Sequence, residues 1–179
     1  MSSIFRLKFT YKYEDKKTGE IKKTKTEIFA ECETYTEAET MVYAIVEHNN
    51  WDEFGPFEYE IIKTKYTTGD FIDHDTLTND GLDVTVEGKV ENYFSEDNDG
   101  FFILKVKFIY LDDKGNEKSN TKVYIVTDHS IGQAIISLKN YLNRSQMLEY
   151  AITDSKLDPA DCIYLCPDSY ESIRSKYEA

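Results

Sequence analysis

The side chains with the clearest potential for chemistry are basic and lie close together near the N-terminus. The segment between residues 5 and 26 contains eight Lys and Arg residues and three acidic ones, although the formal net charge of the chain is −13. A positive strip next to Tyr and Phe rings is typical of proteins that bind single-stranded nucleic acid through phosphate contacts and base stacking. The candidate residues for such a site are Arg6, Lys8, Lys12, Lys22, Lys23 and Lys25.

The same lysines have a second interpretation, as the solvated face of a strand. Phe9, Tyr11 and Tyr13 alternate with basic residues, so that a strand would turn these rings to the opposite face, toward a core. Lysines on an exposed strand also block pairing with other sheets. The acidic remainder of the chain could match a basic protein partner. Protein binding and nucleic-acid binding therefore both stay open.

An acidic stretch offers ligands for a metal ion, but its spacing matches no metal-binding motif. Its members are Asp70, Asp73, His74 and Asp75. We interpret this stretch as a solvated linker. The segment SEDNDG at 95–100 would put Val106 at the twelfth position of a calcium loop, where Glu is required. We predict a turn there and no metal site.

The remaining reactive residue types form no catalytic pattern. Cys32, Cys162 and Cys166 make no zinc or disulfide framework, which favours the reduced thiols of a cytosolic protein. The three histidines match no known nucleophile motif, and the eight glycines form no phosphate-binding loop. No export leader or long apolar run is seen. We expect no enzymatic activity, no cofactor, no membrane association and a cytoplasmic location.

The elements that position these side chains occur twice in the sequence. Residues 7–20 match residues 104–117 at an offset of 97, and residues 27–38 match residues 123–134 at an offset of 96. The phrases FEYEIIKTKYTTGDFI at 57–72 and LEYAITDSKLDPADCI at 148–163 match at an offset of 91. Two small deletions in the second copy explain the three offsets. We expect a duplicated unit covering 4–73 and 102–164.

Each copy predicts the element order β-β-α-β. Apolar and polar residues alternate over 5–13, a Gly-containing turn follows, and a second strand is expected at 21–31. A helix then begins, with Thr34 or Thr36 as its cap in one copy and Ser130 in the other. The repeated phrase supplies a returning strand. The predicted fold is α+β, with two tandem β-β-α-β units about a pseudo-twofold axis, an extra strand or hairpin between them, and a short C-terminal helix.

The predicted domains follow the chain in three ranges. Residues 1–73 form the first unit, residues 74–101 a linker with the extra strand, and residues 102–179 the second unit with the C-terminal helix. The polar, turn-rich segment 67–81 is the best linker candidate. Small sheets have exposed edges, so a homodimer is possible.

Three segments together resemble a known family. They are LKFTYKYEDKKTGEIKK at 7–23, the helix entry TEAE at 36–39, and FEYEIIKTKYTTGDFI at 57–72. They resemble an uncharacterised family, a domain of unknown function found in Bacteroidetes and their crAss-like phages, here in tandem duplicate. The resemblance covers the first unit and, more weakly, the second. It implies a bacterial or phage cytoplasmic setting and no established activity, so it transfers no site residues.

The sequence leaves three candidate functions, which we rank from first to third. The first is a non-enzymatic protein-interaction role, such as an inhibitor of a host system or a structural component, through the acidic surface or the sheet edges. The second is binding of single-stranded nucleic acid through the basic hairpin at 6–25. The third is a small-ligand binder or enzyme that uses a cleft between the two units.

Overall fold

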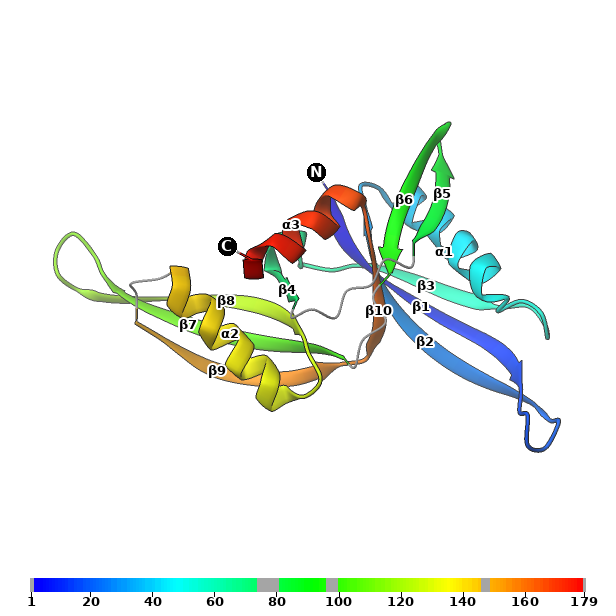
Figure 1. Ribbon diagram of the computed structural model, residues 1–179, viewed down its shortest axis with the longest axis horizontal. Coiled ribbons are helices and arrows are strands. Elements are labelled where there is room, and N and C mark those ends of the chain that lie inside the picture. The colour runs from blue at the N-terminus through cyan, green and yellow to red at the C-terminus, as the bar shows by residue number, and fades with distance from the viewer. Residues whose placement is uncertain (1, 74–80, 96–99, 146–148, 179) are drawn as a thin grey trace. The chain divides into compact units, whose positions relative to one another are not determined.

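The computed structural model describes residues 2–73, 81–95, 100–145 and 149–178 (Figure 1), and it is α+β as predicted. The chain forms two compact units. Unit 1 comprises Met1–Thr68, Thr78–Asp97 and Ala160–Tyr170, and unit 2 comprises Gly69–Leu77, Asn98–Pro159 and Glu171–Ala179. Each unit is made of segments that are separated in the chain. The three contiguous ranges 1–73, 74–101 and 102–179 describe the repeats of the sequence, and they stay a prediction.

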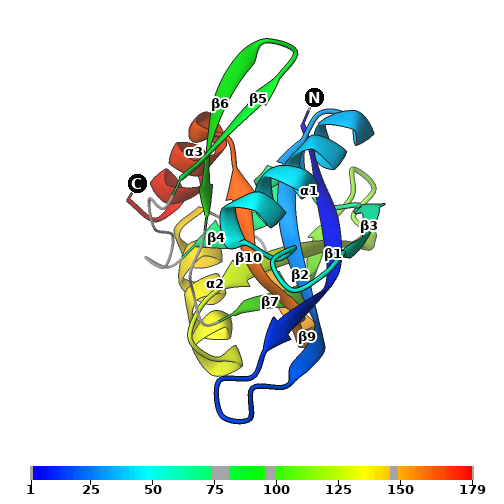
Figure 2. The ribbon, with the colours of Figure 1, turned by 90° about the vertical axis from the view of Figure 1, so that its right-hand side faces the viewer.

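Unit 1 contains a six-stranded sheet in the order β3-β1-β2-β10-β6-β5, with α1 on one face (Figure 2). Only β10 runs parallel to a neighbour, β2, while the other pairs are antiparallel. The elements are β1 (Ser3–Glu14), β2 (Ile21–Cys32), α1 (Tyr35–Asn49), β3 (Glu58–Lys63), β5 (Leu82–Val86), β6 (Lys89–Ser95) and β10 (Ala160–Leu165).

The alternation in β1 confirms the predicted inner face. Phe5, Leu7 and Phe9 are 3%, 0% and 1% exposed and pack in the core of unit 1. Burying each such side chain stabilises the fold by about 1.5–3 kcal/mol. The apolar stripe of α1 covers them, and its buried members are Ala38, Met41, Val42, Ile45 and Val46.

The first helix begins at one of the two predicted caps, Thr34. Its hydroxyl accepts a hydrogen bond from the backbone N–H of Glu37 at 3.1 Å, while the Glu37 carboxylate accepts one from the Glu33 N–H at 3.2 Å. The second helix has the predicted cap as well, because the Ser130 hydroxyl accepts from the Gln133 N–H at 3.2 Å. Each cap satisfies an N–H that the helix itself leaves without a partner.

Replacing Thr34 by Ala is expected to lower the free energy of unfolding by about 1 kcal/mol, because the N–H of Glu37 loses its acceptor. Thr34→Ser keeps the hydroxyl and is expected to stay close to the wild type. Urea unfolding followed by circular dichroism measures both variants. An Ala variant as stable as the Ser variant would show that this cap contributes nothing.

The extra element predicted before the second copy is a β-hairpin formed by β5 and β6. Its turn places Glu87 and Gly88 at φ 52° and φ 80°, the left-handed conformation that two-residue hairpin turns need. Strand β6 pairs with β10, which joins the hairpin to the sheet of unit 1. The SEDNDG turn lies largely outside the described residues.

Unit 2 contains a four-stranded sheet in the order β4-β8-β7-β9, and α2 lies across one face of it (Figure 1). Leu104 and Val106 of β7 are fully buried against Ala134 and Leu138 of α2. The elements are β4 (Phe71–Asp73), β7 (Phe101–Leu111), β8 (Glu117–Thr127), α2 (Ile131–Ser145) and β9 (Glu149–Asp158), with a short 3-10 turn η1 (Thr68–Asp70) before β4.

Strand β4 corrects the linker prediction. Phe71, Ile72 and Asp73 are each at most 2% exposed and pair parallel with β8. The Asp73 carboxylate accepts a hydrogen bond from the Thr127 hydroxyl at 2.5 Å and pairs with the Arg174 guanidinium at 3.0 Å. A solvated linker is therefore wrong for these three residues, because their partner strand lies far along the chain. His74 and Asp75 lie outside the described residues.

The predicted C-terminal helix is confirmed as α3 (Pro167–Glu178). Its Lys176 ammonium donates to the backbone carbonyls of Gly69 and Phe71 at 2.8 and 2.7 Å. Burial lowers the pKa of Lys176 to about 8, with a smaller contribution from Lys122 and an opposing one from Asp70.

None of the helices in the described ranges is both long and apolar enough to cross a membrane.

Since the folded state lowers the pKa of Lys176 from 10.5 to about 8, it binds fewer protons than the unfolded state between these values. Stability should therefore rise with pH across the window from pH 8 to 10.5, relative to a Lys176→Met variant. Urea titrations at closely spaced pH values measure the two slopes. Identical slopes for the two proteins would contradict a lowered pKa at Lys176.

Candidate functional site

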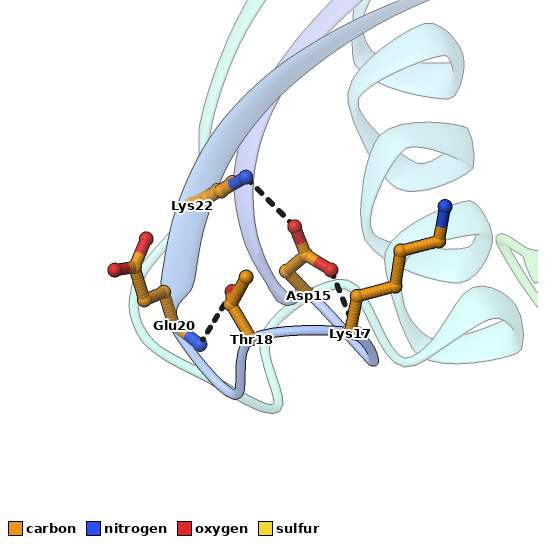
Figure 3. Close-up of polar contacts among 5 residues, drawn as sticks. All are labelled: Asp15, Lys17, Thr18, Glu20 and Lys22. Atoms are coloured by element: carbon orange, nitrogen blue, oxygen red, sulfur yellow. Dashed lines mark hydrogen bonds and ion pairs between the residues drawn. The ribbon is translucent and has the colours of Figure 1, made fainter.

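The turn of the β1–β2 hairpin is held by Asp15 (Figure 3). The backbone N–H of Asp15 donates to the Glu20 carbonyl at 2.8 Å, and its carboxylate accepts from the Lys17 N–H at 2.9 Å. Gly19 has φ 73°, a conformation that other residues adopt only with strain. The turn is thus a stable structural unit made by its own residues.

Lys22 belongs to this turn and is not part of the predicted basic face. Its ammonium lies 2.7 Å from the Asp15 carboxylate (Figure 3), and this contact is the main reason that the pKa of Asp15 is lowered. Opposite residues of an antiparallel pair share a face, and Lys22 is opposite Tyr13. The register therefore puts Lys22 on the face of the aromatic residues, opposite to the face of Lys8.

Two other predicted residues share one carboxylate, that of Glu27. Arg6 lies 3.5 Å from Glu27, and Lys8 lies 4.0 Å from the same carboxylate. The Arg6 guanidinium also stacks over the ring of Phe29, 4.7 Å from its centroid. These contacts give Arg6 a structural role on the outer face of the sheet, whereas Lys8 is more exposed on the same face.

The structure brings Lys12, Lys23 and Lys25 together on that face. Lys12 is directly opposite Lys23, and Lys25 is opposite Thr10 on the next position of the same face. The ion pairs found within the described ranges do not include these three lysines. Two like charges directly opposite each other destabilise a sheet, so that this pair favours a nearby anion.

A shallow depression of about 370 Å³ lies next to these lysines on unit 1. Lys8 and Lys25 line it together with three carboxylates, which belong to Glu27, Glu58 and Glu60. The aromatic rings of Tyr11 and Trp51 stack on each other on the opposite face, 4.4 Å apart. The depression therefore has an acidic excess, whereas the tip of the hairpin is basic.

A buried polar cluster in unit 1 was not expected from the sequence. Glu31 is 2% exposed, and its carboxylate accepts hydrogen bonds from the Cys166 N–H at 2.9 Å and the Ser169 hydroxyl at 2.6 Å. It thereby caps α3, whose positive end favours a carboxylate. Burial raises the pKa of the thiols of Cys32 and Cys166, which favours the protonated form of both at neutral pH.

Unit 2 contains a groove of about 550 Å³ between α2 and β9. Ile135 and Lys139 of α2 line one wall, and β9 from Tyr150 to Ser155 lines the other. Ile135, Tyr150 and Ile152 pack at the margin of the core, which makes an apolar floor. Lys139 and Asp154 place one charge of each sign in the lining.

Strand β9 is the outer strand of its sheet and pairs only with β7 among the described strands. A bulge at Thr153 divides its pairing, because Asp154 is opposite Lys105 and Ile152 is opposite Val106. An outer strand presents unpaired N–H and C=O groups, and a bulge limits which strands can pair with it. The groove therefore runs along a selective, open sheet edge.

The corresponding place in unit 1 holds a cluster of aromatic rings. Helices α1 and α2 begin at Tyr35 and Ile131, so that Tyr43 occupies the position of Lys139. The ring of Tyr43 packs edge-on against Tyr59 of β3 and against Phe57 directly before this strand, with centroids 5.8 and 5.7 Å apart. An aromatic cluster thus occupies in unit 1 the space that is a groove in unit 2.

The sequence contained a signal for this groove. Extending the 96-residue offset through the helices pairs Glu39 with Ile135 and Tyr43 with Lys139. Tyr59 and Tyr150 are identical in the two copies, whereas the neighbouring aromatic residue of the first copy is a lysine in the second. This difference indicates that aromatic packing is lost at one sheet edge.

Among the described residues, no group of three or more His, Cys, Asp or Glu side chains could hold a metal ion.

The comparisons place this fold in a family. The model of the domain of unknown function DUF4494 matches residues 3–164, and the chain therefore belongs to that family. The match extends through both β-β-α-β segments. Comparison with curated proteins and with solved structures gave no match. The predicted membership of an uncharacterised domain family is confirmed.

Proposed function

We propose that this protein binds an extended segment of a partner protein, which adds as a strand to the free edge of β9 and fills the groove beside α2. The observation that carries the proposal is the groove of about 550 Å³ along an outer strand, at a place that Tyr43 fills in unit 1. Strand addition supplies backbone hydrogen bonds, and the groove selects the side chains.

The lining defines the chemistry of the partner segment. Side chains two residues apart on an added strand point to the same face. Two apolar side chains at that spacing would cover the floor made by Ile135 and Ile152. Lys139 at the helix wall favours a carboxylate on the partner, whereas Asp154 favours a basic side chain nearer the strand. The partner is thus an extended, amphipathic peptide segment.

Selection from a random peptide display library tests this proposal. The expected result is a set of peptides with apolar residues at alternating positions, which bind the wild type and compete with one another. Their fluorescence anisotropy with the full chain gives the affinity. Selection of no such pattern, or of peptides that bind equally well after Ile152→Lys, would overturn the proposal.

The broader role follows from the resemblance and the repeated elements. We propose that the chain arose by tandem duplication, comes from a gut bacterium or its phage, and acts in the cytoplasm as an inhibitor of a host system or a structural component. The order β-β-α-β at β1–β3 and again at β7–β9 supports the duplication. Capture of a host protein by the wild type and its loss with Ile152→Lys would support the inhibitor role, and a phage particle containing the chain would support the structural one.

A second candidate function rests on the lysines at the tip of the β1–β2 hairpin. Lys12 and Lys23 face each other with Lys25 nearby, which favours contact with the phosphates of single-stranded nucleic acid. Anisotropy of a labelled oligonucleotide at low and high salt tests this candidate. Salt-sensitive binding that Lys23→Glu removes and Lys22→Glu retains would support it, and no binding at low salt would exclude it.

A further inference from the structure

The two repeated phrases each build two strands. Their first parts form β3 and β9, which pair with β1 and β7, the first strands of their own copies. Six positions are identical at the offset of 91. They are Glu58 and Glu149, Tyr59 and Tyr150, Ile61 and Ile152, Lys65 and Lys156, Asp70 and Asp161, and Ile72 and Ile163.

The last parts of the phrases pair with the other copy. Strand β4 ends the first phrase and runs parallel to β8, with Ile72 opposite Val126. Strand β10 contains the end of the second phrase and runs parallel to β2, with Ile163 opposite Phe29. Strands β2 and β8 hold the same place in their copies, directly before the helix. Each copy therefore gives its last strand and receives one.

We infer that the chain consists of two repeats that exchange their last strands reciprocally, so that each compact unit is completed by a strand from the other repeat. The exchanged strands are part of the two cores. Ile72 is fully buried in unit 2, and Ile163 and Leu165 are 1% and 0% exposed in unit 1. Strand β10 also lies between β2 and β6, so that its loss would divide the sheet of unit 1.

The C-terminal helix fastens both exchanged strands. At its start, directly after β10, Glu31 of β2 accepts from the Cys166 N–H and the Ser169 hydroxyl within unit 1. In unit 2, Arg174 pairs with Asp73 of β4 at 3.0 Å, and Lys176 donates to the Phe71 carbonyl at 2.7 Å. One helix thus makes polar contacts at the end of each exchanged strand.

The exchange defines the kind of partner that a single repeat requires. In a chain with one repeat, the second strand would lack the parallel strand that pairs with one of its edges. The last strand of that repeat would likewise have no strand to pair with in its own sheet. The partner that supplies both missing pairings is a second copy of the repeat, which completes both sheets in one step. In this protein the second copy is in the same chain.

Hydrogen exchange of the full chain, followed by mass spectrometry, tests the inference with two crossed variants. Ile163→Ala is expected to raise exchange in β2 by about tenfold or more and to spare β8. Ile72→Ala is expected to do the reverse. Ile136→Ala, at a helix position that is 52% exposed, is the control and should change neither strand. Loosening of β8 by Ile163→Ala with β2 unchanged would overturn the exchange.

A measurement on the wild type decides the matter if either variant unfolds the whole chain. In the nuclear Overhauser spectrum, protons of Ile163 are expected to lie close to those of Phe29, and protons of Ile72 close to those of Val126. Contacts that link Ile163 to β8 instead would show that each repeat keeps its own last strand.

Discussion

Replacing Ile135 by Lys is expected to weaken the binding of a selected peptide at β9 by at least tenfold. Ile135 packs at the margin of the core and lines the groove, so that an apolar side chain of the peptide would be buried against it. An ammonium at this position would lose its water against an apolar side chain of the peptide, at a cost above the 1.4 kcal/mol that corresponds to tenfold in affinity. Fluorescence anisotropy of the labelled peptide measures the change.

The neighbouring residue provides the matched control. Ile136 carries the same side chain one position further along α2 but is 52% exposed and does not line the groove. Ile136→Lys should therefore bind the peptide as the wild type does. Equal losses in both variants would show a general effect on the helix, and full binding by Ile135→Lys would exclude the groove as the binding site.

Replacing Glu31 by Ala is expected to give the largest loss of stability, about 3 kcal/mol. The carboxylate is 2% exposed, and its removal would leave two part-buried donors without an acceptor, at about 1–3 kcal/mol each before relaxation. The helix α3 would also lose the negative charge at its start. Denaturant unfolding of the full chain measures the loss.

A second variant separates the two contributions at Glu31. Ser169→Ala removes one hydrogen bond and leaves the contact to the Cys166 N–H, so about 1 kcal/mol is expected. If Ser169→Ala destabilised the protein as much as Glu31→Ala, the hydrogen bond from the Cys166 N–H to Glu31 would contribute nothing to stability. A Glu31→Ala variant as stable as the wild type would contradict a structural role for the carboxylate.

Local patterns predicted those elements whose partners are close in the chain. The alternation of Phe5, Leu7 and Phe9 defined the inner face of β1, because a two-residue period fixes which side chains are buried. The hydroxyl of Thr34 marked the start of α1, because a cap acts on N–H groups two or three residues away. The helices α1 and α2 and the two long hairpins, β1–β2 and β7–β8, were predicted for such local reasons.

The exchanged strands could not be predicted in this way. Strand β4 has three residues and lies in a polar, turn-rich segment, and its partner β8 follows 44 positions or more later. A parallel pair carries no turn between its strands, so no local signal connects them. The same limit applied to Lys22, whose face depends on the register set by the turn at Gly19.

The groove was missed because it exists where a large aromatic side chain of the first copy has no counterpart in the second. A sequence pattern reports residues that fill a core, whereas the hollow beside β9 follows from Lys139 standing where unit 1 has Tyr43. Comparison of the two copies makes this substitution visible. Internal repeats therefore offer a reference for finding a site.

Hydrogen exchange of the complex with a selected peptide tests the binding account most directly. The peptide is expected to slow exchange of the β9 amides that face outward, within 149–158, and to leave the β3 amides within 58–63 unchanged, because Tyr43 fills the equivalent place there. Slowed exchange in β3 or in the β1–β2 hairpin, with β9 unchanged, would contradict the assignment of the site.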